Sequence, residues 1–483
     1  NEIVNPSHNA HIGSMLAARL SRRSALKGSL GATSAALLGA VSLSACGGSD
    51  SYDIPVPPTP EAKRLNFNAV AKTNADLVTV PEGYQVSILH ALGDPLSFGH
   101  ESWKDDGSET PESYDQRIGD GHDGMYFFGM SDDGKFDANR SDRGLLCVNH
   151  EYVVAPYGLH PTGRIVADGK RPADQVEKEI RAHGASIVEV KRKSGSNDME
   201  MVRGSRYNRR VTSATPMDFG GPAAGNAKLV NKLSPNGTQA FGMNNNCANG
   251  YTPWGTYLTC EENFTNVISR AAGDNALRSA KEVTALNRYG MTQGRNSPYL
   301  WDTAGTDDLF VRWTSSVTGA AATDDYRNIA NTFGWVVEID PFNPTSTPAK
   351  RSALGRFNHE GAWPAPAVAG KPIVMYMGDD ARNEYIYKFV SKAVWDPKDV
   401  NGGMAAGAKY LDEGTLYVAK FNADGTGQWL ELTYGKNGLD ASNAAYPFAD
   451  QGDVVTHARL AADKLGATKM DRPEWGAVNP LNG

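Results

Sequence analysis

The chain has 483 residues, enough for one large domain or about three ordinary ones. Its formal net charge is −7 at pH 7, and this mildly acidic balance argues against nucleic acid as a partner. An acidic, oxygen-rich protein is well suited to binding hard divalent cations.

The first segment of the chain has the features of an export signal. Two adjacent arginines, Arg22 and Arg23, precede an apolar, Ala/Leu/Gly-rich run over residues 28–45. The run is uncharged and too short for a membrane span, which disfavours both a surface helix and an anchoring helix. We therefore predict a twin-arginine signal peptide over residues 1–46, with export to the periplasm, to an outer-membrane tether or to the cell exterior.

Cys46 allows two interpretations of how this signal ends. The four residues that end at Cys46, Leu-Ser-Ala-Cys, resemble a lipoprotein processing site, in which Cys46 would carry a lipid and tether the protein to a membrane. Ordinary cleavage nearby is the alternative, because small residues before a cleavage point look alike. Residues 47–64, with a run rich in Pro, Ser and Asp, are predicted to form a flexible tether before a single catalytic domain at residues 65–483.

Three cysteines remain after the signal: Cys147, Cys247 and Cys260. Export makes disulfides possible, but an odd number leaves at least one thiol free or bound to a metal. Cys147 and Cys247 could pair with each other or simply be buried, and the sequence leaves both alternatives open.

Past the signal, short apolar runs alternate with Gly, Asp, Asn and Pro, the pattern of strands and turns. The predicted strands are residues 86–90, 124–128, 144–149, 185–192, 255–260, 335–339, 373–377, 385–390, 415–421 and 428–432. Helical periodicity is scarce, and the better candidates are residues 174–182 and 455–465. Many short strands without a Gly-rich nucleotide fingerprint predict an all-β protein, a β-propeller more than a sandwich, with a few short helices and long loops.

The predicted strand that ends at Cys260 runs directly into two adjacent carboxylates, Glu261 and Glu262. Adjacent side chains of a strand point to opposite faces, but a strand end twists and can bring both carboxylates to one cation or cluster of cations. Taken alone, the segment is better explained by a small buried cysteine followed by glutamates in a solvated loop.

Three other segments place similar side chains at the ends of apolar runs. Asn-His-Glu occurs twice, ending at Glu151 and at Glu360, and Gly-Asp-Asp occurs at residues 378–380. Each triplet alone is typical of a capped turn or a buried histidine. Together they favour a polynuclear metal site in the central channel of a propeller, where strands from separate blades converge. Carboxylate and carboxamide oxygens suit calcium, whereas a thiolate suits iron or zinc.

Arg382 and Glu384 lie two residues apart at the start of a predicted strand, so we expect them to face the same way. Beside a metal cluster, an arginine binds a second anion, most naturally phosphate, through its planar fork of donors. As a structural ion pair, Arg382 would instead hold Asp379 or Glu384, and the residues alone favour neither role.

Residues 246–263 resemble the central motif of PhoX-type alkaline phosphatases, Asn-Cys-Ala-x-Gly-x-Thr-Pro-Trp-Gly-Thr-x-Leu-Thr-Cys-Glu-Glu-Asn. The twin-arginine leader is similar too, and the likeness runs in order over nearly the whole exported chain. The Cys-Glu-Glu-Asn and Gly-Asp-Asp-x-Arg-x-Glu-Tyr stretches are quite specific, while Asn249 and Tyr257 depart from the usual pattern outside the expected ligands. Further similar segments are residues 334–341, 358–361, 376–389 and 466–474.

The resemblance implies a six-bladed β-propeller whose channel holds several calcium ions and an oxo-bridged pair of ferric ions. It implies that Cys260 is an iron ligand and that Glu261 is a bridging or calcium-binding carboxylate. Glu360 and Glu384 would be further metal ligands, and Arg382 would bind the substrate phosphate. Arg382 and Glu384 are the predicted catalytic residues. Looser metal-binding assignments fall on Glu151, Glu262, Asp379 and Glu474.

The predicted activity is that of a secreted alkaline phosphatase, which releases inorganic phosphate from small phosphate monoesters. Several cations and Arg382 would screen the charge of the phosphate, and a metal-bound hydroxide or the oxo bridge would attack in line, so no serine nucleophile is required. We expect a monomer. Two alternatives remain open: a calcium-dependent propeller lactonase or phosphotriesterase that needs neither thiolate nor iron, and a non-catalytic propeller that binds phosphate or a partner.

Overall fold

The computed structural model describes residues 67–104, 106–154 and 158–479. The chain divides into two compact units, Asn1–Gln85 and Val86–Gly483, and all helices and strands given below belong to the second unit. The predicted signal peptide, Cys46 and the tether lie outside the described residues, so export and lipidation stay predictions. No helix in the described part of the chain has the length and apolar character needed to cross a bilayer.

The first sheet of the second unit is antiparallel, with β1 to β4 in sequence order and β5 also paired with β3. Ala185 and Ile187 of β3 pack into one hydrophobic cluster and Val188 and Val190 into another, because alternate side chains of a strand point to opposite faces. Its strands are β1 (His122–Gly129), β2 (Arg143–His150), β3 (Gly184–Arg192), β4 (Met199–Met201) and β5 (Arg209–Val211).

The second sheet has the strand order β7-β6-β11-β10-β9-β8, in which β11 and β6 pair in parallel. A tight turn joins β8 to β9, with Gly255 at φ 89° and its amide bonded to the carbonyl of Thr252. A side chain at Gly255 would meet the ring of Phe136, so only glycine fits. The strands are β6 (Pro216–Gly220), β7 (Gln239–Phe241), β8 (Asn246–Tyr251), β9 (Tyr257–Glu261), β10 (Val336–Ile339) and β11 (Ala349–Arg351).

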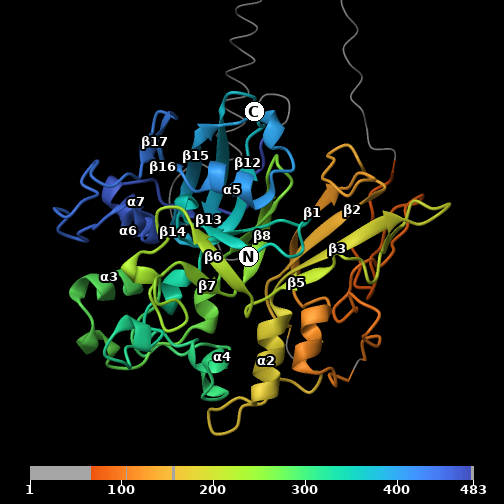
Figure 1. Cartoon of the computed structure of the whole chain (residues 1–483), viewed down its shortest axis with the longest axis horizontal. Helices are drawn as coiled ribbons and strands as arrows, with labels where there is room; N and C mark the ends of the chain where they lie inside the picture. The colour runs from red at the N-terminus through yellow and green to blue at the C-terminus, as the bar shows by residue number, and fades with distance from the viewer. Residues whose placement is uncertain (1–66, 105, 155–157, 480–483) are drawn as a thin grey trace, which may run out of the picture. The chain divides into compact units, whose positions relative to one another are not determined.

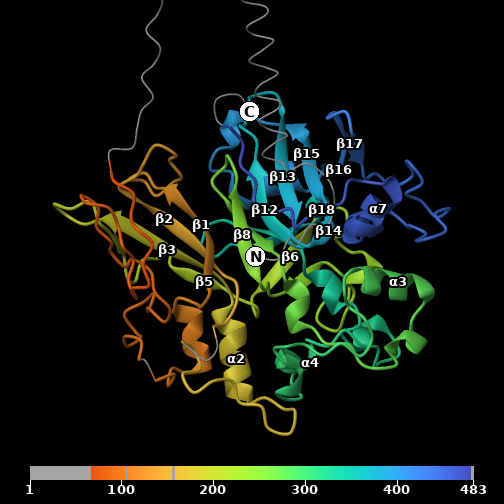
Figure 2. The same ribbon diagram turned by 180° about the vertical axis from the view of Figure 1, so that it is seen from behind.

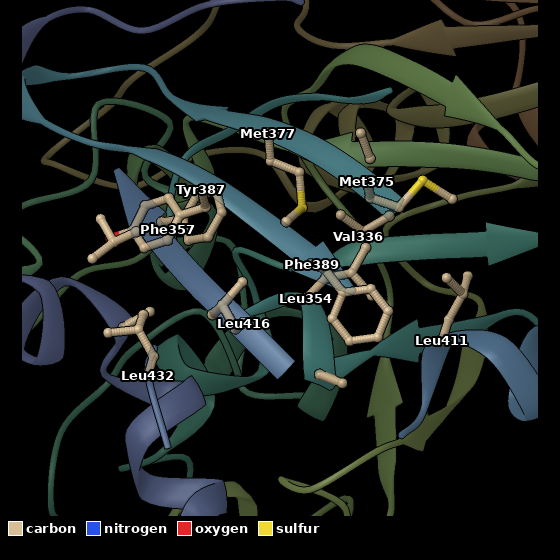
Figure 3. Packing of buried hydrophobic residues seen from close by; sticks show 14 of the residues in the cluster. Val336, Leu354, Phe357, Met375, Met377, Tyr387, Phe389, Leu411, Leu416 and Leu432 are labelled. Atoms are coloured by element: carbon tan, nitrogen blue, oxygen red, sulfur yellow. The ribbon is translucent and has the colours of Figure 1, made fainter. Parts of the chain in front are cut away.

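The third sheet has the order β12-β13-β15-β16-β17, and a separate two-stranded ladder joins β14 to β18. One face of this sheet carries the largest hydrophobic cluster, with Met375 and Met377 of β13 beside Tyr387 and Phe389 of β15 (Figure 3). The strands are β12 (His359–Pro364), β13 (Pro372–Asp379), β14 (Arg382–Glu384), β15 (Ile386–Val394), β16 (Gly414–Phe421), β17 (Gly427–Glu431) and β18 (Met470–Asp471).

The three large sheets meet through their edge strands β1, β8 and β12, and Figures 1 and 2 show β8 between the other two sheets. The backbones approach closely: a Cβ built at Gly250 would lie 1.8 Å from the carbonyl oxygen of Ala362. A Cβ at Gly124 would likewise lie 2.7 Å from the carbonyl oxygen of Cys247. The fold is therefore mostly β, and the six-bladed propeller stays a prediction.

Helices occupy the connections. The helix predicted at residues 174–182 is α2, whereas the one predicted at residues 455–465 is interrupted, because His457 adopts φ −119° and ψ 44°. The α-helices are α2 (Ala173–Ala182), α3 (Ala280–Arg288), α4 (Asp308–Val311), α5 (Gly403–Leu411), α6 (Gln451–Thr456) and α7 (Ala458–Leu465). Short 3₁₀ turns occur at Pro111–Gln116, Ala227–Leu229, Phe264–Val267, Asp274–Leu277, Trp301–Thr303, Ala322–Asp324, Ile329–Thr332, Ser352–Leu354 and Pro397–Asp399.

Residues 86–90 are the one predicted strand without a counterpart in the described chain. Their alternating apolar side chains do not form a buried face, since Val86 and Ile88 are 52% and 87% exposed. His90 instead bonds to His122 and to Ser186 through its ring nitrogens. The other predicted strands coincide with β1, β2, β3, β9, β10, β13, β15, β16 and β17.

Candidate metal centre

Carboxylates and one thiol gather where β1, β8 and β12 meet. Ligand atoms of Asp123, Glu151 and Cys247 all lie within 4.8 Å of one another. The same is true of Cys247, Glu262 and Glu360, so the thiol belongs to both sets. We call these five residues the Cys247 cluster.

The local irregularity of the edge strands positions these side chains. Strand pairing shifts register around Asp123 in β1, around Cys247 in β8 and immediately after Glu360 in β12. A bulge adds a residue to one strand and re-aims the side chains beside it, and bulges are common next to active sites. Glu151 and Glu262 follow the last residues of β2 and β9, as the sequence predicted for strand ends.

The thiol of Cys247 lies between two carboxylates. Its Sγ is 3.3 Å from Oδ2 of Asp123 and 3.3 Å from Oε1 of Glu360, yet it has a single proton to donate. Burial and the nearby carboxylate of Glu360 raise the pKa of Cys247 far above its ordinary value. A cation at this position would favour the thiolate and relieve the repulsion between the acids.

Three glutamates of the cluster hold their protons strongly. Burial and the adjacent Asp123 raise the pKa of Glu151 to about 7. Burial, Glu360 and Glu151 raise the pKa of Glu262 to about 9. For Glu360, burial outweighs a hydrogen bond from Cys247 and raises the pKa to about 7. Such shifts arise when negative charges crowd together away from water without a compensating cation.

Protein cations compensate little of this charge. Within the described residues, no salt bridge involves Asp123, Glu151, Glu262 or Glu360. Arg472 binds Asp380 and lies 3.3 Å from Glu474. Asp380 in turn shares a hydrogen bond with Glu262, so it extends the acidic group.

Asparagines beside Cys247 add oxygen donors. Asn244, Asn245, Asn246 and Asn249 are each at most 2% exposed, and the side-chain oxygen of each lacks a hydrogen-bond partner. Buried polar atoms are nearly always hydrogen-bonded, so unpaired oxygens here indicate a place for a ligand. Amide and carboxylate oxygens suit calcium and a thiolate suits iron, so the donors fit a centre with both kinds of ion.

Cys260, the predicted iron ligand, lies elsewhere. Its side chain is fully buried in the largest hydrophobic cluster with Leu258 and Val336, and burial raises its pKa far above the ordinary value. The thiol among the carboxylates is that of Cys247, and Cys147, Cys247 and Cys260 are all free. The pairing of Cys147 with Cys247 that the sequence allowed is therefore absent. Iron binding by Cys260 stays a prediction that this packing does not support.

Glu261, the predicted bridging carboxylate, is held by a protein cation. Its oxygens lie 2.8 and 3.0 Å from Nζ of Lys350, and both side chains are fully buried. It also accepts hydrogen bonds of 3.0 Å from the amides of Gly334 and Trp335. Because adjacent residues of β9 point to opposite faces, Glu261 turns away from Glu262, and metal binding by Glu261 stays an unsupported prediction.

Glu384 and Asp379 form an ion-pair network with two arginines. Arg288 donates to Glu384 at 2.5 and 2.9 Å, and Arg459 donates to Asp379 at 2.8 Å. Arg459 also lies 3.6 Å from Glu384. Neither carboxylate belongs to the ligand sets found among the described residues, so their assignment as metal ligands stays a prediction.

Arg382 and Glu384 do not face the same way, contrary to the sequence-based expectation. Asn383 between them adopts φ 66° and the pairing shifts register, so Arg382 is exposed while Glu384 is buried. The guanidinium of Arg382 is 3.8 Å from Asp471, and its side chain is 68% exposed. A period of two fails here because a left-handed residue reverses the alternation.

Several residues of the centre escaped the sequence analysis as ligands. Asp123 was missed because it precedes a predicted strand instead of following one. Cys247 was noticed only as a possible disulfide partner, although its asparagine-rich surroundings were a usable signal. Asp380 was recognised only within a turn motif, and Arg472 approaches the acids from a distant part of the chain.

Comparison with known proteins identifies the family. The sequence profile described as "Alkaline phosphatase PhoX" matches residues 65–483. A solved structure, "Pseudomonas fluorescens PhoX in complex with vanadate, a transition state analogue", is 39% identical to the chain, with a TM-score of 0.73. The similarity covers 86% of this chain and 66% of that one, just under two thirds of its length, and no curated protein matches. As its motifs predicted, the chain belongs to the PhoX alkaline phosphatase family.

Proposed function

We propose that this protein is a metal-dependent alkaline phosphatase that hydrolyses small phosphate monoesters at the Cys247 cluster. One observation carries the proposal: carboxylates and a thiol from distant strands meet around Cys247, and no cation of the described residues forms a salt bridge with these carboxylates. Membership of the PhoX family supports the activity, and so does the relative whose structure was determined with vanadate, a transition-state analogue.

We assign iron to the thiol side of the cluster, where Cys247 lies against Asp123 and Glu360. Calcium would occupy the oxygen-rich side, with Glu151, Glu262 and the neighbouring asparagine oxygens. This assignment gives Cys247 the role that motif comparison gave to Cys260. When bound, the metals supply charge that stabilises the phosphoryl group and activates water.

The chain's own residues bind and orient the ester in this proposal. Arg382 has an exposed guanidinium, so its fork of donors is available to a phosphate. Arg472 is paired with Asp380 and Glu474, and it fixes these two acids beside the cluster. The buried carboxylates hold the cations in place, and their low-dielectric surroundings strengthen every charge interaction with the substrate.

We also infer the architecture and location of the enzyme. The mostly β fold and membership of the PhoX family support a six-bladed propeller with one catalytic domain over residues 65–483. The leader sequence supports export through the twin-arginine pathway, with or without a lipid on Cys46. A monomer is the expected state, because one chain provides all the residues of the cluster.

Metal analysis combined with an aryl phosphate assay at alkaline pH tests the proposal. The native protein should contain iron and calcium and lose activity on chelation. Cys247→Ala should lose iron and at least about a hundredfold of activity, while the matched variant Cys260→Ala should retain both. If Cys260→Ala lost iron and activity while Cys247→Ala retained both, the iron ligand would be Cys260.

Other outcomes favour the alternatives. An active preparation that contains calcium and no iron would support a propeller lactonase or phosphotriesterase. Failure to turn over any phosphate ester, with iron and calcium both present, would support a non-catalytic phosphate-binding or partner-binding propeller.

A further inference from the structure

A row of four aromatic rings runs beside the Cys247 cluster, formed by Tyr126, Tyr251, Trp363 and Trp475. Tyr126 and Tyr251 stack with their centroids 4.4 Å apart, and Tyr251 meets Trp363 edge to face at 5.3 Å. Trp363 and Trp475 continue the row at 6.0 Å. We call these four residues the aromatic row.

The row follows the same strands as the cluster. Tyr126 lies on β1 with Asp123, Tyr251 lies on β8 with Cys247, and Trp363 lies on β12 with Glu360. The bulges in these strands therefore position a ligand and, three or four residues later, a ring. At about 3.3 Å per residue, the rings lie about 10 to 13 Å along each strand from the ligands.

Trp475 places the last ring of the row against the residue that follows Glu360. Its ring lies 3.0 Å from a Cβ built at Gly361, the residue that follows Glu360. The backbone before it also packs closely, since the carbonyl oxygens of Pro473 and Glu474 lie 2.4 Å from a Cβ built at Gly378. Two glycines thus allow the C-terminal segment to bring Trp475 against β12, beside a residue of the cluster.

Trp475 is also the most accessible ring of the row. It is 45% exposed, whereas the rings of Tyr126, Tyr251 and Trp363 are partly buried. Contacts with Gly361 and Trp363 hold one side of the indole in place while the rest faces solvent. A fixed, accessible aromatic surface is the arrangement proteins use to stack on planar rings of a ligand.

We propose that Trp475, supported by Trp363, stacks on the organic part of the substrate, and that the enzyme prefers phosphate monoesters bearing a planar ring. The class includes nucleoside monophosphates and aryl phosphates and excludes glycerol phosphate. This inference rests on the proposed phosphatase function, because the phosphate end of such a molecule would occupy the Cys247 cluster while its ring contacts Trp475.

A substrate-pair experiment on the metal-loaded enzyme tests the inference. We expect Trp475→Ala to lower kcat/KM for a nucleoside 5′-monophosphate about tenfold more than kcat/KM for glycerol phosphate. Trp475→Phe should preserve most of the preference and Trp475→Leu should lose it, because leucine keeps apolar volume without a π face. The control is Trp429→Ala, an exposed tryptophan on β17 at the opposite edge of the same sheet, which should leave the preference unchanged.

The outcomes separate this inference from the activity on which it depends. Equal losses on both substrates in all three Trp475 variants would overturn stacking and give Trp475 a purely structural role in placing Glu474. No loss on either substrate would overturn it as well. If the native, metal-loaded protein hydrolysed neither ester, the phosphatase proposal itself would fail, and the Trp475 variants would play no part in that conclusion.

Discussion

Buried carboxylates occur in two contrasting settings in this protein. Glu179 of α2 is fully buried and contacts His160, Arg164 and Arg171, with Arg171 at 2.6 Å. Glu262 of the Cys247 cluster is also buried, but its neighbours are other acids. Burial alone would raise both pKa values, yet hydrogen bonds from His160 and Arg171 lower that of Glu179 to about 2, while that of Glu262 rises to about 9.

The contrast shows which carboxylates serve the fold and which serve a ligand. A buried charge is costly unless it is paired, and Glu179, Glu261 and Glu384 all have protein partners. Glu262 and Glu360 are buried or half-buried, and neither forms a salt bridge with any described residue. Under the proposed function, a bound cation supplies their balancing charge.

The strongest test of the contrast neutralises two adjacent glutamates, one at a time. Glu262→Gln should lower activity by at least about a hundredfold, because a neutral amide cannot replace the charge that holds a cation. The metal-free variant should be as stable as the metal-free native protein. Glu261→Gln should show the opposite pattern, because buried Lys350 would lose its carboxylate while the cluster stays intact. Activity assays and calorimetry on both variants measure these effects. Equal changes in activity and in stability would contradict the contrast between the two carboxylates.

The Glu179 network predicts a defined pH dependence of stability. At pH 7, Glu179→Gln should cost about 3–5 kcal/mol of unfolding free energy, because buried Arg171 would be left unpaired. The pKa of Glu179 is lowered from 4.5 to about 2, so its contribution is complete above about pH 4.5 and is lost as the pH falls towards 2. Urea unfolding at pH 7 and at pH 3 should show the gap between native and variant shrinking. A constant gap would contradict the assignment.

Removal of metals should destabilise the protein through the cluster alone. At metal concentrations about a hundredfold above Kd, each site contributes about 2.7 kcal/mol, so chelation should lower Tm at neutral pH. The decrease in unfolding free energy should be the same in Glu179→Gln, within about 0.5 kcal/mol, because no salt bridge among the described residues joins the two regions. Strong coupling between chelation and Glu179 would show that the two settings are not independent.

Arg382→Ala should produce the smallest change in stability. Among the described residues, the guanidinium of Arg382 forms one ion pair, with Asp471 at 3.8 Å. Both side chains are 68% exposed, so we expect a change in unfolding free energy below about 0.5 kcal/mol. KM for a phosphate ester should nevertheless rise, because the guanidinium is proposed to bind the phosphate. An unchanged KM would direct attention to Arg472 as the phosphate-binding arginine.

Local sequence patterns predicted most of the strands correctly. Residues 144–149 form a continuous apolar run, residues 185–192 are partly alternating, and the two segments coincide with β2 and β3. The pattern at residues 86–90 is similar, but that segment remains exposed, and only tertiary contacts distinguish the two cases. The break at His457 was equally hidden, since its neighbours favour a continuous helix.

The metal centre was predicted only in part, because local sequence does not show which distant residues meet. Glu151, Glu262 and Glu360 each stand out in the sequence, and the structure brings them together. The fate of Glu261 depends on Lys350, which is 89 residues away and cannot be anticipated from local sequence. Choosing between Cys247 and Cys260 likewise required knowledge of which strand face meets the other sheets.

The scattered origin of the cluster has a consequence for biogenesis. The carboxylate acceptors of Cys247 lie 124 residues before it and 113 residues after it. A growing polypeptide that has not yet delivered Glu360 lacks a complete coordination shell, so ions cannot template its early collapse. Under the proposed function, cation capture is therefore a late event, and a chain truncated before β12 would emerge from the ribosome unable to mature.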